Sequence, residues 1–260
     1  MTLRRFFLPP DQTRAPELQL TGPEAHHALK VLRLGLGDAV AVHNGAGDVW
    51  ECQVRAITPR AAILVKTRHR VFPPPSFELT LLQALPKGKV FDDIIHRATE
   101  LGATRLIPLL SEHSAVHLAG AEAIAKTAKW NLIAREALKQ SGAPWLLEVG
   151  SPVTPQAFLA RAPVFDLALV ASLEPGSQPP REVLRPFLAQ PVPPGRTTLA
   201  VWVGPEGDFT PAEYAAIRAG GARPISLGPL VLRCETAACY CLAIVNYEAQ
   251  AGASAPAPRS

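Results

Sequence analysis

The sequence has little of what marks several common classes of protein. Only 4 cysteines occur in 260 residues, and aromatic residues make up 6%. Cys52, Cys234, Cys239 and Cys241 lack the paired CxxC spacing of a structural zinc site and are too few for a disulfide framework. No apolar run reaches the roughly 20 residues of a membrane span, and residues 1–10 end before a signal-peptide core. The sequence therefore predicts a cytoplasmic protein that binds no metal.

Several catalytic signatures are also missing. The chain contains no GxxxxGK[ST] loop, no GxGxxG after a strand, no GxSxG elbow and no HExxH pair. ATP hydrolysis, hydride transfer, serine hydrolysis and zinc chemistry therefore lose support. Hydrophobic residues make up 48% of the chain, which is enough for one large domain or two smaller ones. The remaining candidates are group transfers.

Charge and proline content divide the chain. Residues 1–70 hold ten Lys and Arg against six Asp and Glu and so carry the whole net charge of +4. A basic end on a neutral body is typical of a polyanion-binding module, although a solvated face of ordinary composition explains it equally well. Pro73–Pro75 remove amide donors and stiffen the backbone. We therefore expect a domain at residues 1–72, a second at 73–250 and a flexible tail at 251–260.

The two domains differ in their sequence period. The first has strand-like runs around the turn Asn44–Gly47 and one short basic helix at 22–33, which predicts a small β barrel or sheet. The second alternates strands with helices, which predicts an α/β fold with a mostly parallel sheet covered on both faces. The expected strands are 39–43, 49–54, 61–66, 79–85, 106–110, 167–171, 198–203 and 224–227, and the expected long helices are 92–101, 122–140, 211–219 and 234–249.

Two unusual loops follow neighbouring strand ends of the second domain. They are Gly204–Gly207 and Gly228–Arg233, and a capping box at Thr210 and Glu213 follows the first. Ligands of open α/β sheets bind beyond the carboxyl ends of the strands, so the two loops can line one pocket. Residues 230–232 would supply an apolar slot for adenine. Taken alone, either Gly-Pro loop is more often an ordinary turn than a ligand-binding loop.

These residues resemble a known family. Gly204–Gly207 with Phe209, Thr210 and Glu213, followed by 227–237 (LGPLVLRCETA), is similar to the paired signature of the bacterial methyltransferases that modify N3 of a uridine in 16S ribosomal RNA. These enzymes belong to the trefoil-knotted SPOUT superfamily. The resemblance includes nearly the whole chain, with further motifs at 27, 31–33, 37–38, 84–88, 97–102, 108–114, 130, 136–137 and 140–142.

The resemblance implies a PUA-like RNA-binding domain and a methyltransferase domain with a deep C-terminal trefoil knot. It also implies S-adenosylmethionine as cofactor, 16S ribosomal RNA or the 30S subunit as substrate, and a homodimer with the pocket near the subunit interface. This sequence departs from the family pattern at three positions: Asp208 stands where a third glycine is common, and His113 and Ala143 stand where arginine is common.

The expected site follows from these motifs. Arg233 would stabilise the uridine anion or orient a phosphate, although a salt bridge with Glu206 or Glu235 would also explain it. Glu206 would hold the cofactor loop or act as a base. The residues expected to bind the cofactor are Val203, Gly204, Pro205, Glu206, Gly207, Leu227, Gly228, Leu230, Leu232, Glu235 and Thr236. The residues expected to contact RNA phosphates are Arg4, Arg5, His27, Lys30 and Arg33.

Three interpretations remain open from the sequence. The leading one is a dimeric S-adenosylmethionine-dependent methyltransferase of uridine N3 in ribosomal RNA. The second is a SPOUT enzyme that methylates a ribose or another base. The third is a non-catalytic RNA-binding or ribosome-assembly protein that uses the knot as a scaffold. The two glycine loops together with Arg233 favour an enzyme over a scaffold.

Overall fold

The chain forms two compact units. A computed structural model describes residues 3–114, 116, 118–190 and 196–251. One unit contains Met1–Pro74 and Arg135–Leu146, and the other contains Pro75–Ala134 and Leu147–Ser260. Residues 252–260 of the expected flexible tail lie outside the described residues. No helix in the described part of the chain is long and apolar enough to cross a lipid bilayer.

The first unit is built on a five-stranded sheet with the order β1-β3-β4-β5-β2. Strand β1 runs parallel to β3, and the other neighbours are antiparallel. Apolar side chains that alternate along these strands form one core, which includes Phe6, Leu18, Val42 and Leu64. The elements of this unit are β1 (Arg4–Phe7), η1 (Pro10–Thr13), β2 (Glu17–Leu20), α1 (Gly22–His26), η2 (His27–Val31), β3 (Ala39–His43), β4 (Asp48–Thr58) and β5 (Ala61–Val71).

The C-terminal end of helix α3 (Gly120–Ser141) belongs to this first unit. The Arg5 guanidinium donates hydrogen bonds to the carbonyl oxygens of Lys139 at 3.2 Å and Gln140 at 2.9 Å. The buried Lys139 ammonium lies 2.8 Å from a carboxylate oxygen of Glu24 and 2.8 Å from one of Glu136. The last carbonyls of a helix have no partner inside the helix, so Arg5 satisfies groups that would otherwise need water. The sequence alone did not assign residues 135–146 to the first domain.

The second unit contains a six-stranded parallel sheet with the order β11-β9-β10-β6-β7-β8. The all-parallel pairing confirms the α/β prediction from the alternating strands and helices. The elements are β6 (Phe77–Ala84), α2 (Val90–Glu100), β7 (Arg105–Leu109), α3, β8 (Glu148–Val149), α4 (Pro155–Leu159), β9 (Leu167–Ala171), α5 (Pro180–Leu188), β10 (Thr197–Val203), α6 (Pro211–Ala219), β11 (Ala222–Ile225) and α7 (Cys234–Ala251).

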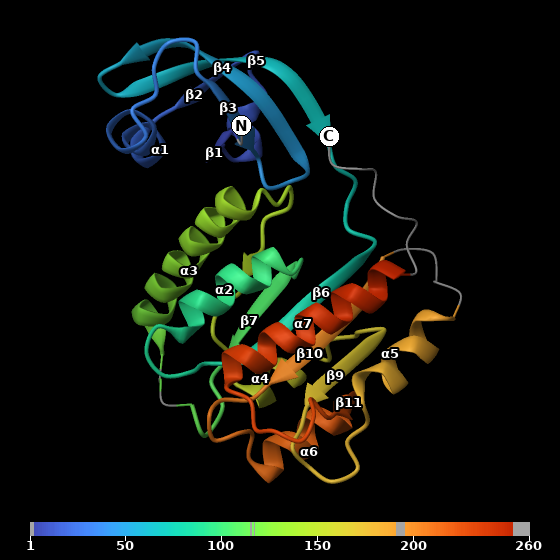
Figure 1. Cartoon of the computed structure of the whole chain (residues 1–260). Helices are drawn as coiled ribbons and strands as arrows, with labels where there is room; N and C mark the ends of the chain where they lie inside the picture. The colour runs from blue at the N-terminus through green and yellow to red at the C-terminus, as the bar shows by residue number, and fades with distance from the viewer. Residues whose placement is uncertain (1–2, 115, 117, 191–195, 252–260) are drawn as a thin grey trace. The chain divides into compact units, whose positions relative to one another are not determined.

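Helices cover both faces of the parallel sheet. On one face, Trp202 of β10 packs in a core with Tyr214 and Ile217 of α6 and with Phe158 of α4. Helix α7 contacts β6 and β10, and α2 packs on α7. In Figure 1 these two helices lie in front of the sheet. Burial on both faces explains why the strands read as continuous apolar runs rather than as alternating ones.

Most expected elements are present, and the differences are local. The expected helix at 22–33 is a short α-helix continued by a π-helix, and Arg33 ends it with a φ of 52°. The strand expected at 224–227 lies two residues earlier, because β11 pairs with β9 from Ala222 to Ile225. Strands β1, β2 and β8 and helices α4 and α5 were not predicted from the sequence.

Candidate functional site

A cavity of about 270 Å³ opens at the carboxyl ends of the parallel strands, and both glycine loops line it. The loops follow β10 and β11, which the sequence analysis took as neighbours. That assumption is wrong, because β9 lies between them in the sheet. The residues after β9 therefore form a third wall. The lining residues are Ala171, Ser172, Leu173, Val203, Gly204, Pro205, Glu206, Asp208, Leu227, Gly228, Leu230, Val231, Leu232, Arg233, Cys234 and Ala237.

The wall after β9 carries the hydroxyl group of Ser172, whose oxygen already accepts two hydrogen bonds. Ser172 is buried, and its Oγ accepts hydrogen bonds from the Tyr214 hydroxyl at 2.7 Å and from the Glu174 amide at 3.0 Å. The hydroxyl hydrogen is therefore the group that Ser172 can offer to a ligand. The sequence analysis missed Ser172, since its position depends on the pairing of β9 with strands that come later in the chain.

The loop after β10 is held by hydrogen bonds from three directions. The Gln83 side-chain amide donates to the Gly204 carbonyl oxygen at 3.5 Å, and the Lys87 backbone amide donates to the Glu206 carboxylate at 3.1 Å. Helix α6 begins directly after the loop with the predicted capping box of Thr210 and Glu213, which the structure confirms. This wall of the cavity is therefore fixed before any ligand binds.

The turn that closes this loop depends on Asp208 and His113. Asp208 has a left-handed backbone with a φ of 58°, and its Oδ1 accepts a hydrogen bond from the Phe209 amide at 2.8 Å. Nδ1 of the exposed His113 lies 2.9 Å from the Gly207 carbonyl oxygen and 3.0 Å from that of Asp208. These carbonyl oxygens raise the pKa of His113. Burial raises the pKa of Asp208, while the Phe209 amide and His113 oppose the increase.

The loop after β11 is apolar and exposed. Leu230 is 73% exposed and Val231 is 80% exposed, although both line the cavity. Arg233 lies at the end of this loop, immediately before α7, and in the described part of the chain its guanidinium forms no ion pair.

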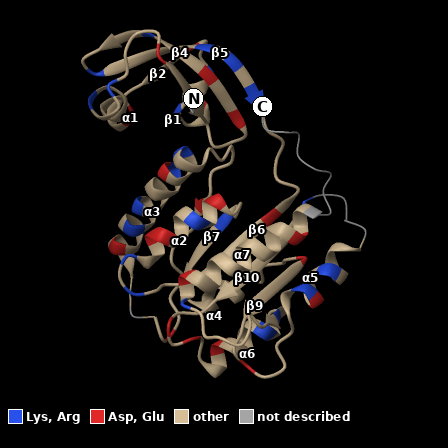
Figure 2. Ribbon diagram, viewed as in Figure 1, with Lys and Arg blue, Asp and Glu red and all other residues tan. Residues whose placement is uncertain are grey.

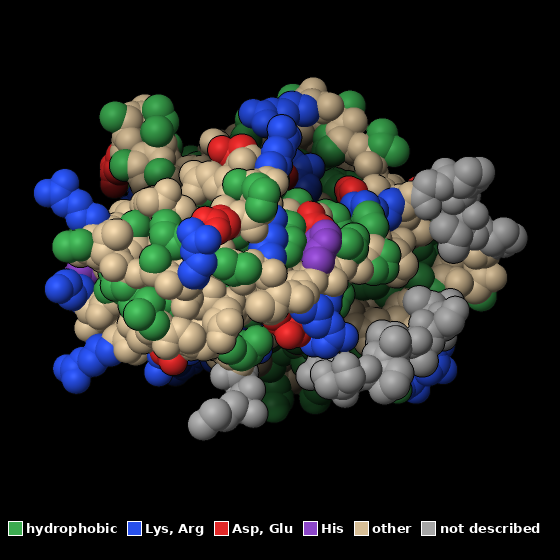
Figure 3. Space-filling model, turned by 90° about the horizontal axis from the view of Figure 1, so that it is seen from above, with side chains coloured by type: hydrophobic (Ala, Val, Ile, Leu, Met, Phe, Trp, Pro, Cys, Tyr) green, Lys and Arg blue, Asp and Glu red, His purple; other side chains and the backbone are tan. Residues whose placement is uncertain are grey.

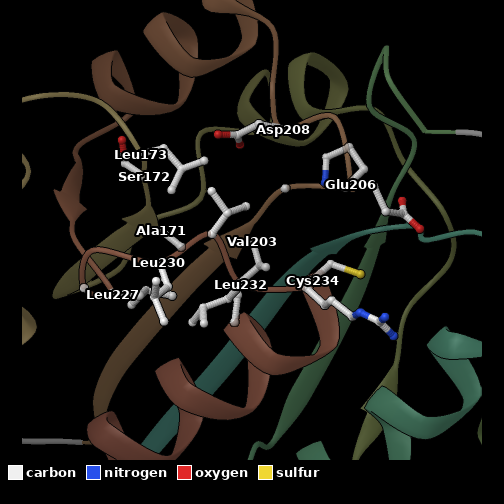
Figure 4. Close-up of a pocket in the computed structure, with 16 residues that line it drawn as sticks. Ala171, Ser172, Leu173, Val203, Glu206, Asp208, Leu227, Leu230, Leu232 and Cys234 are labelled. Carbon is white, nitrogen blue, oxygen red and sulfur yellow. The ribbon is translucent and has the colours of Figure 1, made fainter.

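The first residues of α7 divide into those that line the cavity and those that do not. Cys234 lines it, and burial together with a hydrogen bond to Glu235 raises the pKa of the Cys234 thiol to about 12. A protonated thiol is a poor nucleophile, which argues against covalent catalysis by Cys234. Of the residues expected to bind a cofactor, Gly207, Glu235 and Thr236 do not line the cavity, and the other eight do (Figure 4).

The basic residues expected to contact RNA differ in their surroundings. The Arg4 guanidinium lies 3.4 Å from the Asp38 carboxylate, and Arg5 contacts the end of α3 as described above. Lys30 and Arg33 are exposed, whereas His27 is half-buried. Basic residues also recur at alternate positions of β5, at Lys66, Arg68 and Arg70 (Figure 2). On the face seen from above, basic side chains are spread among apolar ones (Figure 3).

The lining can hold an organic ligand with an apolar and a polar part. Apolar residues form most of the wall, six of them leucine or valine, while Ser172, Glu206, Asp208 and Arg233 supply polar atoms. This division is typical of nucleoside sites, although the cavity lies just below the roughly 300 Å³ at which such pockets usually begin. Among the described residues, no cluster of three or more His, Cys, Asp or Glu could hold a metal ion.

Comparisons with known proteins agree with this geometry. Two proteins named ribosomal RNA small subunit methyltransferase E are similar to the chain. The one from Synechocystis is 35% identical and aligns over 93% of this chain and 77% of its own length. The one from Bacillus subtilis is 31% identical over 91% and 92%. A structure described as a Legionella pneumophila methyltransferase with bound SAM shares the fold, with a TM-score of 0.83, 24% identity and coverage of 95% and 98%.

Family models match both parts of the chain. Residues 20–67 match the RNA methyltransferase PUA domain, and residues 73–246 match the RNA methyltransferase domain. The second match alone covers well over half of the 260 residues and includes the whole cavity. The sequence resemblance is therefore confirmed, and the chain belongs to the RNA methyltransferase family, with a PUA domain followed by a methyltransferase domain.

Proposed function

We propose that this protein methylates N3 of a uridine in 16S ribosomal RNA with S-adenosylmethionine as the methyl donor. The observation that carries the proposal is the cavity, in which both glycine loops meet at the carboxyl ends of the parallel strands with Arg233 at its edge. The names of the relatives support ribosomal RNA of the small subunit as the substrate class. A cytoplasmic location is part of the proposal because the substrate is ribosomal RNA.

The cofactor-binding residues proposed from the sequence fit a nucleoside sulfonium. Leu227, Leu230 and Leu232 offer apolar surface to an adenine, and the Ser172 hydroxyl and loop amides can bond its polar groups. The cofactor supplies an electrophilic methyl group on a positively charged sulfur. Gly204 lies where an added Cβ would be 2.6 Å from the Asp208 carboxylate, so the backbone must be bare at this point of the loop.

The chemistry assigns separate tasks to Arg233 and Glu206. A new bond to N3 needs the nitrogen lone pair, so the N3 proton must leave before or during transfer. An Arg233 guanidinium beside the base stabilises the negative charge that remains on the uracil. Glu206 already accepts the Lys87 amide, which supports a role in holding the loop and leaves proton removal to solvent as the simpler path. The N3 proton would be released to water, and a bound sulfonium donor would supply the methyl group to N3 and leave as the thioether.

The proposal extends to the topology and the oligomeric state. A trefoil knot would pass the segment from Leu227 onward through the chain near Gly204–Gly207, and the meeting of these two segments at one cavity supports it. A homodimer would cover the apolar side chains of Leu230 and Val231, which otherwise face water. Light scattering after size-exclusion chromatography tests the dimer, and a mass of about one chain would contradict it.

The domains and RNA contacts proposed from the sequence complete this assignment. Residues 1–72 would bind RNA and residues 73–250 would carry out methyl transfer. Arg4, Arg5, His27, Lys30 and Arg33 would contact phosphates, with Lys30 and Arg33 the most accessible of the five. The engagement of Arg5 with the end of α3 favours a structural role beside any contact with RNA.

The first experiment measures the product directly. Purified protein is incubated with radiolabelled S-adenosylmethionine and 30S subunits that lack the modification, and the digested RNA is analysed by mass spectrometry. We expect label in 3-methyluridine, and none on subunits that already carry the modification. Label in another nucleoside would show that the protein is a methyltransferase with a different target nucleotide. Cofactor binding without any labelled RNA, with free 16S RNA also tested, would contradict the proposed substrate, and no cofactor binding would favour a scaffold.

A further inference from the structure

Asp208 places a carboxyl group in the cavity from a backbone conformation that few residues adopt. Its φ of 58° lies in the left-handed region, which glycine enters freely and aspartate and asparagine enter at a modest cost. The Asp208 amide donates to the Pro205 carbonyl oxygen at 3.0 Å, so the turn is closed by its own backbone. A glycine would make the same turn at less cost. The Asp208 side chain supports the turn by accepting the Phe209 amide, and it also adds a carboxylate group to the cavity lining.

The Asp208 carboxylate is only partly used by the protein. In the described part of the chain its hydrogen-bond donor is the Phe209 amide at Oδ1, which leaves Oδ2 available. Figure 4 shows the carboxyl group on the same side of the cavity as Ser172 and Leu173, while the Glu206 carboxyl group points away from it. Asp208 and Ser172 are thus two of the few polar residues in a mostly apolar lining.

The charges that line the cavity do not balance. Glu206 and Asp208 are acidic and Arg233 is basic, so the lining carries one net negative charge when all three are ionised. A cavity of this kind favours a cation over a neutral molecule of the same shape. A sulfonium methyl donor carries one more positive charge than the thioether that remains after methyl transfer. The two molecules are otherwise nearly identical, so charge is the property by which a site can distinguish them.

We propose that Asp208 is a specificity-determining residue that makes the cavity prefer the charged methyl donor over its neutral demethylated product. The inference rests on the proposed cofactor and deepens it. Asp208 shifts the relative affinity of donor and product, so that the product is more easily displaced by fresh donor after each turnover. Glu206 contributes less to this selection, because its carboxylate accepts the Lys87 amide and points away from the cavity.

The test compares three ligands on variants that change only the charge. S-adenosylmethionine, S-adenosylhomocysteine and sinefungin, whose amine replaces the sulfonium with another cation, are titrated calorimetrically without RNA. Asp208→Asn keeps the left-handed turn and the acceptor for Phe209 but removes the charge. We expect the affinities for the two cationic ligands to fall about three- to tenfold and that for S-adenosylhomocysteine to change less than about twofold. Asp93→Asn, an exposed carboxylate on α2 outside the cavity lining, is the matched control.

Each alternative outcome is distinct. An equal loss for all three ligands would show that Asp208 acts as a hydrogen-bond acceptor or a structural residue, and unchanged affinities would show that it has no part in binding. Either result overturns the inference. Asp208→Gly, which relieves the turn and removes the charge, must shift the ligand preference in the same direction, and thermal unfolding confirms that both variants are folded. A native protein that binds none of the three ligands would instead contradict the proposed cofactor.

Discussion

The two glycine loops of the cavity look alike in sequence but differ in how the structure holds them. The loop of Gly204–Asp208 is fastened by a backbone amide, a glutamine and a histidine from other parts of the chain. The loop of Gly228–Arg233 is bonded near its ends, by the Gly228 amide to Ser226 and by the Arg233 carbonyl oxygen to Ala237, and its middle side chains face water. The first loop is therefore held by more hydrogen bonds from other parts of the chain than the second.

The largest effect should come from the end of the exposed loop. Arg233→Ala removes the one basic side chain among the described residues that line the cavity, and it should lower the rate of methyl transfer at least about 100-fold. Cofactor and RNA affinities should remain within a few-fold, because the charge is needed on the reacting base. Single-turnover kinetics and binding assays measure both. Arg223→Ala, an exposed arginine of β11 outside the lining, is the control, and an equal loss of binding and transfer would refute the catalytic role.

Alanine substitutions at Gly204 and Gly228 test whether the loop after β10 is more rigid than the loop after β11. A Cβ at Gly204 would lie 3.2 Å from the Asp208 Cα and 3.3 Å from the Phe209 amide nitrogen, so backbone has to move. Gly204→Ala should weaken cofactor binding by about tenfold or more. At Gly228 no atom lies within 4 Å, and the cost comes from a φ of +109° in a loop that can readjust. Gly228→Ala should therefore have the smaller effect, and the reverse order in calorimetry would contradict the comparison.

Shortening the Leu230 side chain tests whether a ligand covers the exposed loop after β11. Leu230→Ala should leave the thermal unfolding of the ligand-free protein unchanged, because the side chain is largely in water. Cofactor affinity should fall about three- to tenfold, as expected from the loss of a partly buried leucine contact. Val164→Ala removes a side chain that is 88% exposed and outside the lining, and should change neither quantity. A lower unfolding temperature of ligand-free Leu230→Ala would show that the loop is already packed.

The smallest effect is expected at His113. His113→Ala removes the donor to the Gly207 and Asp208 carbonyl oxygens, but the ring is exposed and water can replace it. Cofactor affinity should fall only about two- to threefold. Hydrogen exchange of the amides at 204–209 should become faster, while His96→Ala on α2 should leave it unchanged. Unchanged exchange in His113→Ala would show that the other hydrogen bonds fix the loop after β10 without this one.

The sequence predicts an element of the fold well when residues close together in the chain determine that element. The strands at 39–43 and 167–171 are predicted to the residue, because buried apolar runs between turns mark them. Helix α5 was missed because Pro186 lies inside it, and β1 and β2 because four residues give no clear period. The end of β11 was misplaced by two residues because its register is fixed by pairing with β9.

The candidate site divides in the same way. Both loops, Arg233 and Glu206 were predicted because glycines and a charged residue after a strand are visible in the sequence itself. The wall after β9 was missed, since only the strand order places Ser172 between the two loops. The place of Asp208 in the cavity lining was also not predicted. Its departure from the family pattern was noted, but its position in the cavity depends on the turn that His113 and Phe209 stabilise.

The sequence by itself determined the family, the α/β class and the two loops, because these depend on residue types at short spacing along the chain. The tertiary structure decided which of those residues share a cavity. It inserted β9 between the two loop-bearing strands, brought the end of α3 to the first sheet and placed both Ser172 and Asp208 in the lining of one cavity. The physical reason is that strand order and helix docking are set by burial and pairing between distant segments, which local spacing does not encode.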